Sequence, residues 1–158
     1  MKRIYAPWRY EYLISAKKED ECLFCELAKG GDVRSKWILH RGKLWYVVLN
    51  IYPYTSGHIM VVCNRHIESF SELTPEENTE FMGLMSRSEK AIKKAYRPHG
   101  INVGANLGRS AGAGIVGHLH IHLVPRWHGD TNYMTAIGET RVVSEDLEES
   151  YEKLKSSF

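Results

Sequence analysis

The sequence predicts an α+β fold with a mainly antiparallel sheet of about five strands, one long helix and a C-terminal helix. Three observations carry this prediction. β-Rich runs at 44–49 and 58–63 flank a turn-forming segment, apolar side chains recur at helical spacing after residue 74, and residues 118–125 alternate histidine with apolar side chains. Strands placed before and after one long helix are typical of this fold class.

The first part of the chain contains the less regular elements. Residues 1–21 are expected to form an irregular or partly helical arm, and residues 22–29 a short helix that stops at a pair of glycines. The segment 50–57 contains proline, glycine and asparagine, so it should join the two β-rich runs as an antiparallel pair.

The long helix has a clear beginning and end. Thr74 is a good N-cap, Pro75 suits the first helical position, and Glu77 completes a capping box. Pro98 and Gly100 should end the helix. One buried stripe is predicted from the apolar residues Phe81, Leu84, Met85, Ile92, Ala95 and Tyr96.

The remainder of the chain predicts two strands and a second helix. Residues 101–105 and 118–125 have strand patterns and are joined by a glycine-rich stretch. Ser144 should cap a second amphipathic helix. The apolar side of that helix consists of Leu147, Tyr151 and Leu154. We therefore expect a core over 22–135 and a C-terminal strand and helix over 136–158.

The composition fits one globular domain. The chain has 158 residues, 43% hydrophobic and 25% charged side chains and a net charge of +2, so we expect a single domain over 1–158 with no surface for duplex nucleic acid. No apolar run approaches the roughly 20 residues that cross a bilayer. Three cysteines do not make a disulfide framework. We therefore expect a cytoplasmic protein without a membrane partner.

Three histidines occupy alternate positions of the last predicted strand, at His118, His120 and His122. Side chains alternate between the faces of a strand, so the three imidazoles should share one face about 7 Å apart, opposite an apolar face. Two chemical interpretations remain. A His-x-His strand can hold zinc, or one imidazole can act as a nucleophile that its neighbours orient. No further ligand follows soon after His122, and this favours the nucleophile.

Glycines are concentrated just before the histidines. Six of the chain's 13 glycines lie between Gly100 and Gly117. Glycine lets backbone N–H groups approach an anion, so this stretch suits phosphate binding, although a plain flexible connection is the alternative. Residues 112–117 also match a dinucleotide-binding glycine pattern. That pattern requires a following helix, and because a strand is predicted instead we reject it.

Residues 118–124 match the pattern His-φ-His-φ-His-φ-φ, with φ apolar, at every position. This segment resembles the signature of the histidine triad (HIT) family, and the likeness extends over roughly residues 22–135. Residues 124–132 and 7–10 look most like the fragile-histidine-triad and diadenosine tetraphosphate phosphorylase branch. The resemblance implies a HIT-like fold and an adenine nucleotide or dinucleoside polyphosphate as substrate, without an organic cofactor.

The resemblance also implies catalytic roles. His120 would attack the α-phosphorus while a backbone carbonyl holds its other ring nitrogen as N–H. His122 would contact the phosphate or leaving group, with His58 polarising that end and His118 as the fourth catalytic histidine. The implied substrate-binding residues, which include a ribose-contacting asparagine and a phosphate-side segment, are Val48, Asn50, Asn106, Gly108, Gly112, Gly114 and Ile115. Relatives carry polar side chains at the last two positions, so phosphate contacts there must come from the backbone.

Cys22 and Cys25 form a Cys-x-x-Cys pair, which indicates zinc, two small buried residues on a helix, or a redox pair. The resemblance implies a structural zinc with His66 and His118 as the other ligands. A closed site of two cysteines and two histidines leaves no open position for catalysis. Cys63 stays an unpaired core residue.

Three functions are compatible with these residues. The leading hypothesis is an enzyme that cleaves dinucleoside polyphosphates by hydrolysis or phosphorolysis through a nucleotidyl-histidine. The alternatives are a phosphoramidase acting on adenosine phosphoramidates and a nucleotide-binding regulatory module without turnover, although binding alone does not require His120. The resemblance also implies a homodimer that pairs sheets across a two-fold axis.

Overall fold

The computed structural model describes residues 22–158 except 31–32, 139 and 141–142. The predicted α+β fold is confirmed within this range. Five strands form one antiparallel sheet in the order β1-β2-β3-β5-β4. The predicted arm over 1–21 lies outside the described residues, as does the motif at 7–10. Among the described residues, every helix is too short or too polar to span a lipid bilayer.

The strands have the bounds β1 Ile38–Arg41, β2 Trp45–Leu49, β3 Ile59–Cys63, β4 Gly100–Gly104 and β5 His120–Arg126. The predicted pair of β-rich runs is the β2–β3 pair, which is in register from Trp45↔Cys63 to Leu49↔Ile59. The short strand β1 was not predicted from the sequence. Its four residues are too few to show an alternating pattern, and pairing with β2 defines it.

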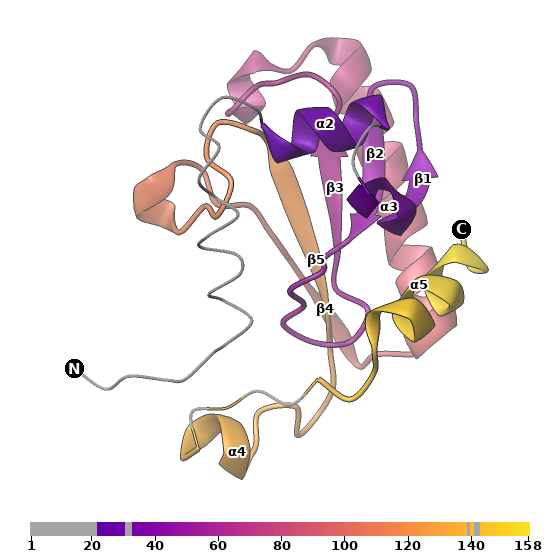
Figure 1. Cartoon of the computed structure of the whole chain (residues 1–158), viewed down its shortest axis with the longest axis vertical. Helices are drawn as coiled ribbons and strands as arrows, with labels where there is room; N and C mark the ends of the chain where they lie inside the picture. Colours follow the sequence, from indigo (N-terminus) through magenta and orange to yellow (C-terminus); the bar gives the residue numbers. More distant parts are fainter. Residues whose placement is uncertain (1–21, 31–32, 139, 141–142) are drawn as a thin grey trace.

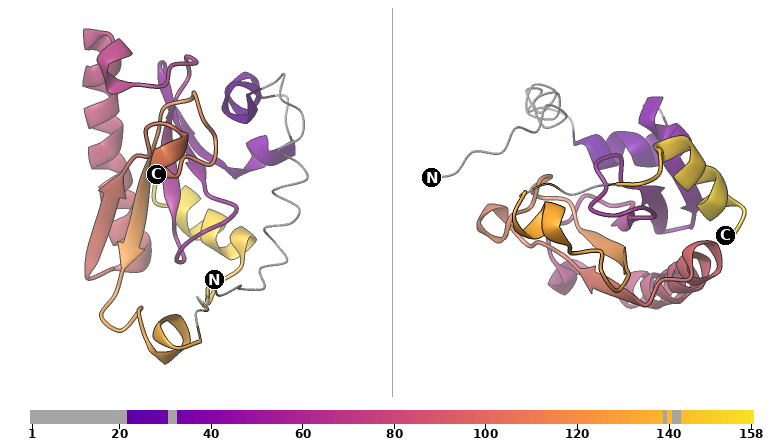
Figure 2. Two further views of the ribbon diagram at one scale, coloured as in Figure 1. Left: turned by 90° about the vertical axis from the view of Figure 1, so that its left-hand side faces the viewer. Right: turned by 90° about the horizontal axis from the view of Figure 1, so that it is seen from below.

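The helices are α2 Leu23–Lys29, α3 Pro75–Tyr96, α4 Tyr133–Ala136 and α5 Leu147–Lys155, with short 3-10 turns η1 Val33–Trp37, η2 Phe70–Glu72 and η3 Arg109–Ala111. Figures 1 and 2 show α3 on one face of the sheet and α2 on the other. The site described below lies on the α2 face.

The ends of α3 follow the local sequence signals. The Thr74 hydroxyl accepts a hydrogen bond from the Glu77 N–H at 3.2 Å, and the Glu77 carboxylate accepts one from the Thr74 N–H at 2.9 Å. The predicted capping box is therefore present. The prediction for α5 was wrong in its cap, because Asp146 and not Ser144 accepts from the first turn. The described part of residues 136–158 contains this helix but no strand.

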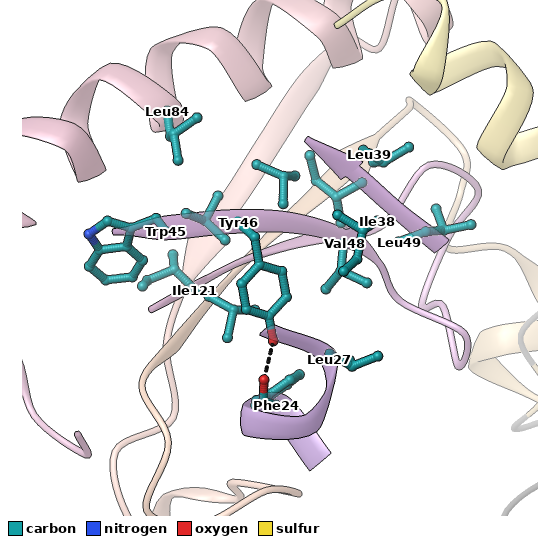
Figure 3. Packing of buried hydrophobic residues seen from close by; sticks show 14 of the residues in the cluster. Phe24, Leu27, Ile38, Leu39, Trp45, Tyr46, Val48, Leu49, Leu84 and Ile121 are labelled. Carbon is teal, nitrogen blue, oxygen red and sulfur yellow. Dashed lines mark hydrogen bonds between the residues drawn. The ribbon is translucent and has the colours of Figure 1, made fainter. Parts of the chain in front are cut away.

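The core fills the space between the sheet and α3 and continues under α2. Strand β2 is buried along its full length. Figure 3 shows Trp45 and Leu84 on the α3 side and Tyr46 directed towards α2, where its hydroxyl donates to the Phe24 carbonyl at 2.9 Å. This bond fixes α2 above β2. Because Tyr46 pairs with Val62 of β3 and Val62 pairs with His120, α2 also lies beside the start of β5.

Candidate active site and metal cluster

The histidine strand differs from the prediction at its first histidine. Strand β5 begins at His120, so His120 and His122 lie on the α2 face while His118 precedes the strand and turns towards the cysteine pair. The expectation that His118 belongs to the strand is therefore wrong, although its ring contacts Phe24 of α2, as the ring of His120 does. The rings of His120 and His122 have centroids 5.1 Å apart, closer than the predicted 7 Å backbone repeat.

His120 is held in one tautomer by the backbone. Its Nδ1 lies 2.8 Å from the carbonyl oxygen of His118. A carbonyl only accepts hydrogen bonds, so Nδ1 carries the proton and Nε2 keeps its lone pair. Burial lowers the pKa of His120 below its ordinary value, and the Phe24 ring packs 4.9 Å from the imidazole. His120 is therefore a neutral, oriented imidazole whose Nε2 keeps its lone pair.

A second chain of hydrogen bonds ends at His122. The Tyr54 N–H donates to Nδ1 of His58 at 3.2 Å, which leaves the proton of a neutral His58 on Nε2. That Nε2 lies 2.9 Å from Nδ1 of His122, so His58 donates and His122 carries its own proton on Nε2. Burial lowers the pKa of His58 to about 3 and that of His122 to about 4. Both rings are neutral at pH 7, and His122 offers an N–H donor.

The predicted ribose residue, Asn50, is engaged with the histidine chain. Its Oδ1 accepts from the Tyr52 N–H at 3.0 Å, and its Nδ2 lies 3.3 Å from Nδ1 of His58. The structure therefore places Asn50 as a support for His58. Val48 is buried on β2 and pairs with Met60, which in turn pairs with His122, so these three residues lie in one row across the sheet.

The predicted phosphate segment forms an ordered turn beside the histidines. Gly104, at the end of β4, pairs with His122. The Asn106 amide donates to the Gly112 carbonyl at 3.3 Å. Gly108 and Gly112 have φ values of 84° and 92°, which favour glycine, and they bracket η3. Gly114 is exposed, and Ile115 packs partly against the core, so neither side chain offers a polar contact.

The structure brings the four predicted metal ligands together. The ligand atoms of Cys22, Cys25, His66 and His118 all lie within 4.8 Å of one another. Sγ of Cys22 is 3.2 Å from Nδ1 of His118, and Sγ of Cys25 is 3.3 Å from Nδ1 of His66. Zinc bonds of roughly 2.3 Å to sulfur and 2.0 Å to nitrogen require separations of this size in a tetrahedron.

The surroundings of this cluster also suit a cation. His118 Nε2 lies 2.7 Å from the Cys63 carbonyl and must donate to it, so Nδ1 presents a lone pair to the thiols. Burial and the neighbouring Cys22 raise the pKa of the Cys25 thiol to about 11. Two adjacent thiolates are therefore stable at neutral pH only with a cation between them. The donor set fits zinc.

Three contributors to the site carry no signal in the sequence. Phe24 packs against the rings of both His118 and His120. Tyr54 contributes its backbone N–H, and its ring lies tilted against that of His58, with the centroids 4.6 Å apart. Cys63 contributes its carbonyl oxygen. Backbone groups and packing residues of this kind are set by tertiary contacts, so residue type alone does not reveal them.

Known proteins are similar to this chain in sequence and in fold. The HIT domain family model matches residues 33–129. An AP-4-A phosphorylase of Mycobacterium tuberculosis is 39% identical over 166 residues, covering 100% of this chain and 85% of that protein. An adenosine 5'-monophosphoramidase of Schizosaccharomyces pombe is 32% identical over 105 residues, covering 66% of this chain and 74% of that protein.

A solved structure agrees with these sequence relatives. The zinc-bound histidine triad family protein from Mycobacterium smegmatis superposes with a TM-score of 0.71 at 25% identity, covering 87% of this chain and 92% of that one. The family model covers more than half of the chain. Most of the predicted signature, including His120, lies on β5. This chain therefore belongs to the HIT domain family.

Proposed function

We propose that this protein transfers a nucleotidyl group from a dinucleoside polyphosphate to phosphate or water through a covalent nucleotidyl-His120 intermediate. The observation that carries the proposal is the 2.8 Å contact from His120 Nδ1 to the His118 carbonyl, which leaves Nε2 free to attack. The 39% identity to an AP-4-A phosphorylase supports this substrate class and favours phosphate as the acceptor.

The first half-reaction forms a bond from His120 Nε2 to the α-phosphorus and breaks the bond from that phosphorus to the bridging oxygen. The bonding electron pair leaves with the departing nucleotide, and the Nε2–H of His122 donates to the oxygen on which this charge develops. His58 keeps that proton on Nε2 by donating to the other nitrogen of His122.

In the second half-reaction an oxygen of phosphate, or of water that gives up a proton to solvent, attacks the same phosphorus. The phosphorus–nitrogen bond breaks, and its electron pair returns to His120 Nε2. With diadenosine tetraphosphate, transfer to phosphate gives ADP and ATP, and transfer to water gives AMP and ATP. Asn106 and the backbone from Gly112 to Ile115 would hold the non-bridging oxygens, since the amide side chain and glycine-rich backbone offer donors there.

We further propose that Cys22, Cys25, His66 and His118 hold a structural zinc. With four protein ligands the metal has no open position, so it supplies folding energy and fixes His118 without taking part in the chemistry. Support comes from the separations within the cluster and from the zinc-bound relative.

A phosphoramidase is the second candidate, supported by the 32% identity to an adenosine 5'-monophosphoramidase. It would use the same nucleophile with a small amine as the leaving group. A binding module without turnover is less well supported, because an oriented imidazole with a free nitrogen has no role in simple binding.

We also propose a homodimer paired through β4. This strand lies at the end of the sheet order and is largely exposed, with Val103 57% exposed, and Met82 on the neighbouring helix is 60% exposed. An exposed, apolar edge strand is a template for pairing with a second copy. We treat residues 1–158 as one HIT domain and place the protein in the cytoplasm, where unpaired thiols stay reduced.

The test of the reaction is incubation with diadenosine tetraphosphate, with and without inorganic phosphate. The proposal expects ADP and ATP with phosphate, and it expects His120→Ala to bind nucleotide without turning it over. Equal turnover by His120→Ala would overturn the mechanism. Adenosine 5'-phosphoramidate as the only cleaved substrate would favour the second candidate.

A further inference from the structure

The proposed site carries little positive charge for a ligand as anionic as a polyphosphate. Residues 44–63 and 104–125 contain every residue assigned to catalysis and nucleotide binding. Apart from histidines, these two stretches contain a single ionisable cation, Arg109, and no Asp or Glu. His58 and His122 are neutral in the hydrogen-bonded chain described above. A dinucleoside polyphosphate carries one negative charge on each phosphate, so a site of neutral imidazoles leaves most of that charge unbalanced.

Arg109 lies on the connection between β4 and β5. The connection leaves the sheet at Gly104, beside His122, and returns to it at His120. Figure 1 shows the η3 turn on a loop that projects to one side of the end at which β5 begins. Both ends of this fifteen-residue connection, 105–119, adjoin the histidines proposed to be catalytic.

The backbone around Arg109 is ordered by its own hydrogen bonds. The Gly112 N–H donates to the Arg109 carbonyl at 3.0 Å, and the Ala111 N–H donates to the Gly108 carbonyl at 3.2 Å. The Asn106 amide closes the same turn on Gly112. Arg109 is therefore held beside the residues proposed to contact the non-bridging oxygens.

Three other arginines among the described residues already have partners. Arg126 bonds Asp130 at 2.6 Å, Arg65 bonds Glu77 at 2.9 Å, and Arg41 donates to two carbonyls of α2. The exposed side chain of Arg109 makes no hydrogen bond or ion pair with any residue in the described part of the chain. Its guanidinium is free to bind a ligand.

We propose that Arg109 binds the phosphates of the leaving nucleotide beyond the α-phosphorus. A guanidinium matches the geometry of two phosphate oxygens and remains charged at any working pH. The incoming nucleophile must attack along the line that the leaving group vacated, so the same arginine holds inorganic phosphate in the second half-reaction. Arg109 thereby selects polyphosphate substrates over small neutral leaving groups. This inference rests on the proposed function.

The experiment compares kcat/KM for diadenosine tetraphosphate with kcat/KM for adenosine 5'-phosphoramidate, whose leaving group carries no phosphate. The proteins are the wild type, Arg109→Ala, Arg109→Lys and the control Lys90→Ala, which removes an exposed cation from α3 on the opposite face. Arg109→Ala should lower the ratio of the two kcat/KM values by roughly tenfold to a hundredfold, the effect of one charge-assisted hydrogen-bonded pair. Arg109→Lys should restore part of the ratio, and Lys90→Ala should not change it.

The same measurements distinguish a failure of the role of Arg109 from a failure of the proposed function. An unchanged ratio in Arg109→Ala, with wild-type turnover intact, would overturn the role of Arg109 and leave the proposed function standing. A wild-type protein that turns over neither compound would overturn the proposed function and this inference with it. A KM for inorganic phosphate that is raised in Arg109→Ala would support the second half of the proposal, and an unchanged one would overturn that half.

Discussion

The carbonyl oxygen of His118 accepts a hydrogen bond of 2.8 Å from Nδ1 of His120. The ring of the same His118 faces the thiols of Cys22 and Cys25 at 3.2 and 3.5 Å. His118 therefore joins the Cys/His cluster to the proposed nucleophile, because its side chain faces the cluster and its backbone carbonyl holds His120. A change in the cluster should reach the active site through this residue.

The first prediction concerns metal binding. Cys25→Ser should reduce the zinc content from about one atom per chain to near zero and lower the free energy of unfolding, because the closed site loses a thiolate ligand. Elemental analysis and urea unfolding would measure both effects. Cys63→Ala is the matched control, since Cys63 is buried outside the cluster, and it should retain zinc. Equal zinc content in the two variants would contradict the ligand assignment.

The second prediction concerns the donor at His122. His122→Ala should lower kcat for diadenosine tetraphosphate by roughly 10²- to 10³-fold, as expected for the loss of a hydrogen-bond donor to the developing oxyanion. The loss should be much smaller for a nucleoside monophosphate ester of p-nitrophenol, whose leaving phenolate is already stabilised. His128→Ala changes an exposed histidine beyond the same strand and should affect neither substrate. Equal losses on both substrates would show that His122 does not stabilise the leaving group.

The third prediction concerns pH and stability. His58 is buried with its pKa lowered from 6.5 to about 3, so between these values the unfolded chain binds a proton that the folded chain does not. Stability should therefore fall as pH decreases through this window, with a slope of about 1.4 kcal/mol per pH unit for one proton. His58→Asn should reduce the slope measured by urea unfolding between pH 6.5 and 4. An unchanged slope in this variant would show that His58 does not contribute to the acid sensitivity.

Local signals in the sequence were sufficient for the elements that depend on local chemistry. The capping box that begins with Thr74 and the β2–β3 pair lie where they were predicted. The four residues that the family resemblance implies as metal ligands lie together in the structure. The local sequence signals gave a wrong prediction where long-range contacts determine the position of a residue. Contacts with the cysteines and the Cys63 carbonyl draw His118 out of the strand. At α5 the N-cap is Asp146 and not the predicted Ser144.

The fourth prediction concerns the N-cap of the long helix α3. Thr74→Ala removes the N-cap acceptor for the Glu77 N–H and should destabilise the protein by about 1 kcal/mol. Thr79→Ala is the control, because that exposed hydroxyl bonds only the carbonyl of Pro75 four residues earlier and alanine is a better helix former. Thermal unfolding would measure both variants. A larger loss in Thr79→Ala than in Thr74→Ala would contradict the role assigned to the cap.

The measurement that bears on the proposed mechanism itself is the position of the covalent adduct. Rapid quenching at alkaline pH during turnover of diadenosine tetraphosphate, followed by peptide mass spectrometry, should find one nucleotidyl group on His120. The adduct should be absent from His120→Ala and should accumulate when inorganic phosphate is withheld. Turnover without any adduct, or an adduct on His118 or His122, would contradict the assignment of His120 as the nucleophile.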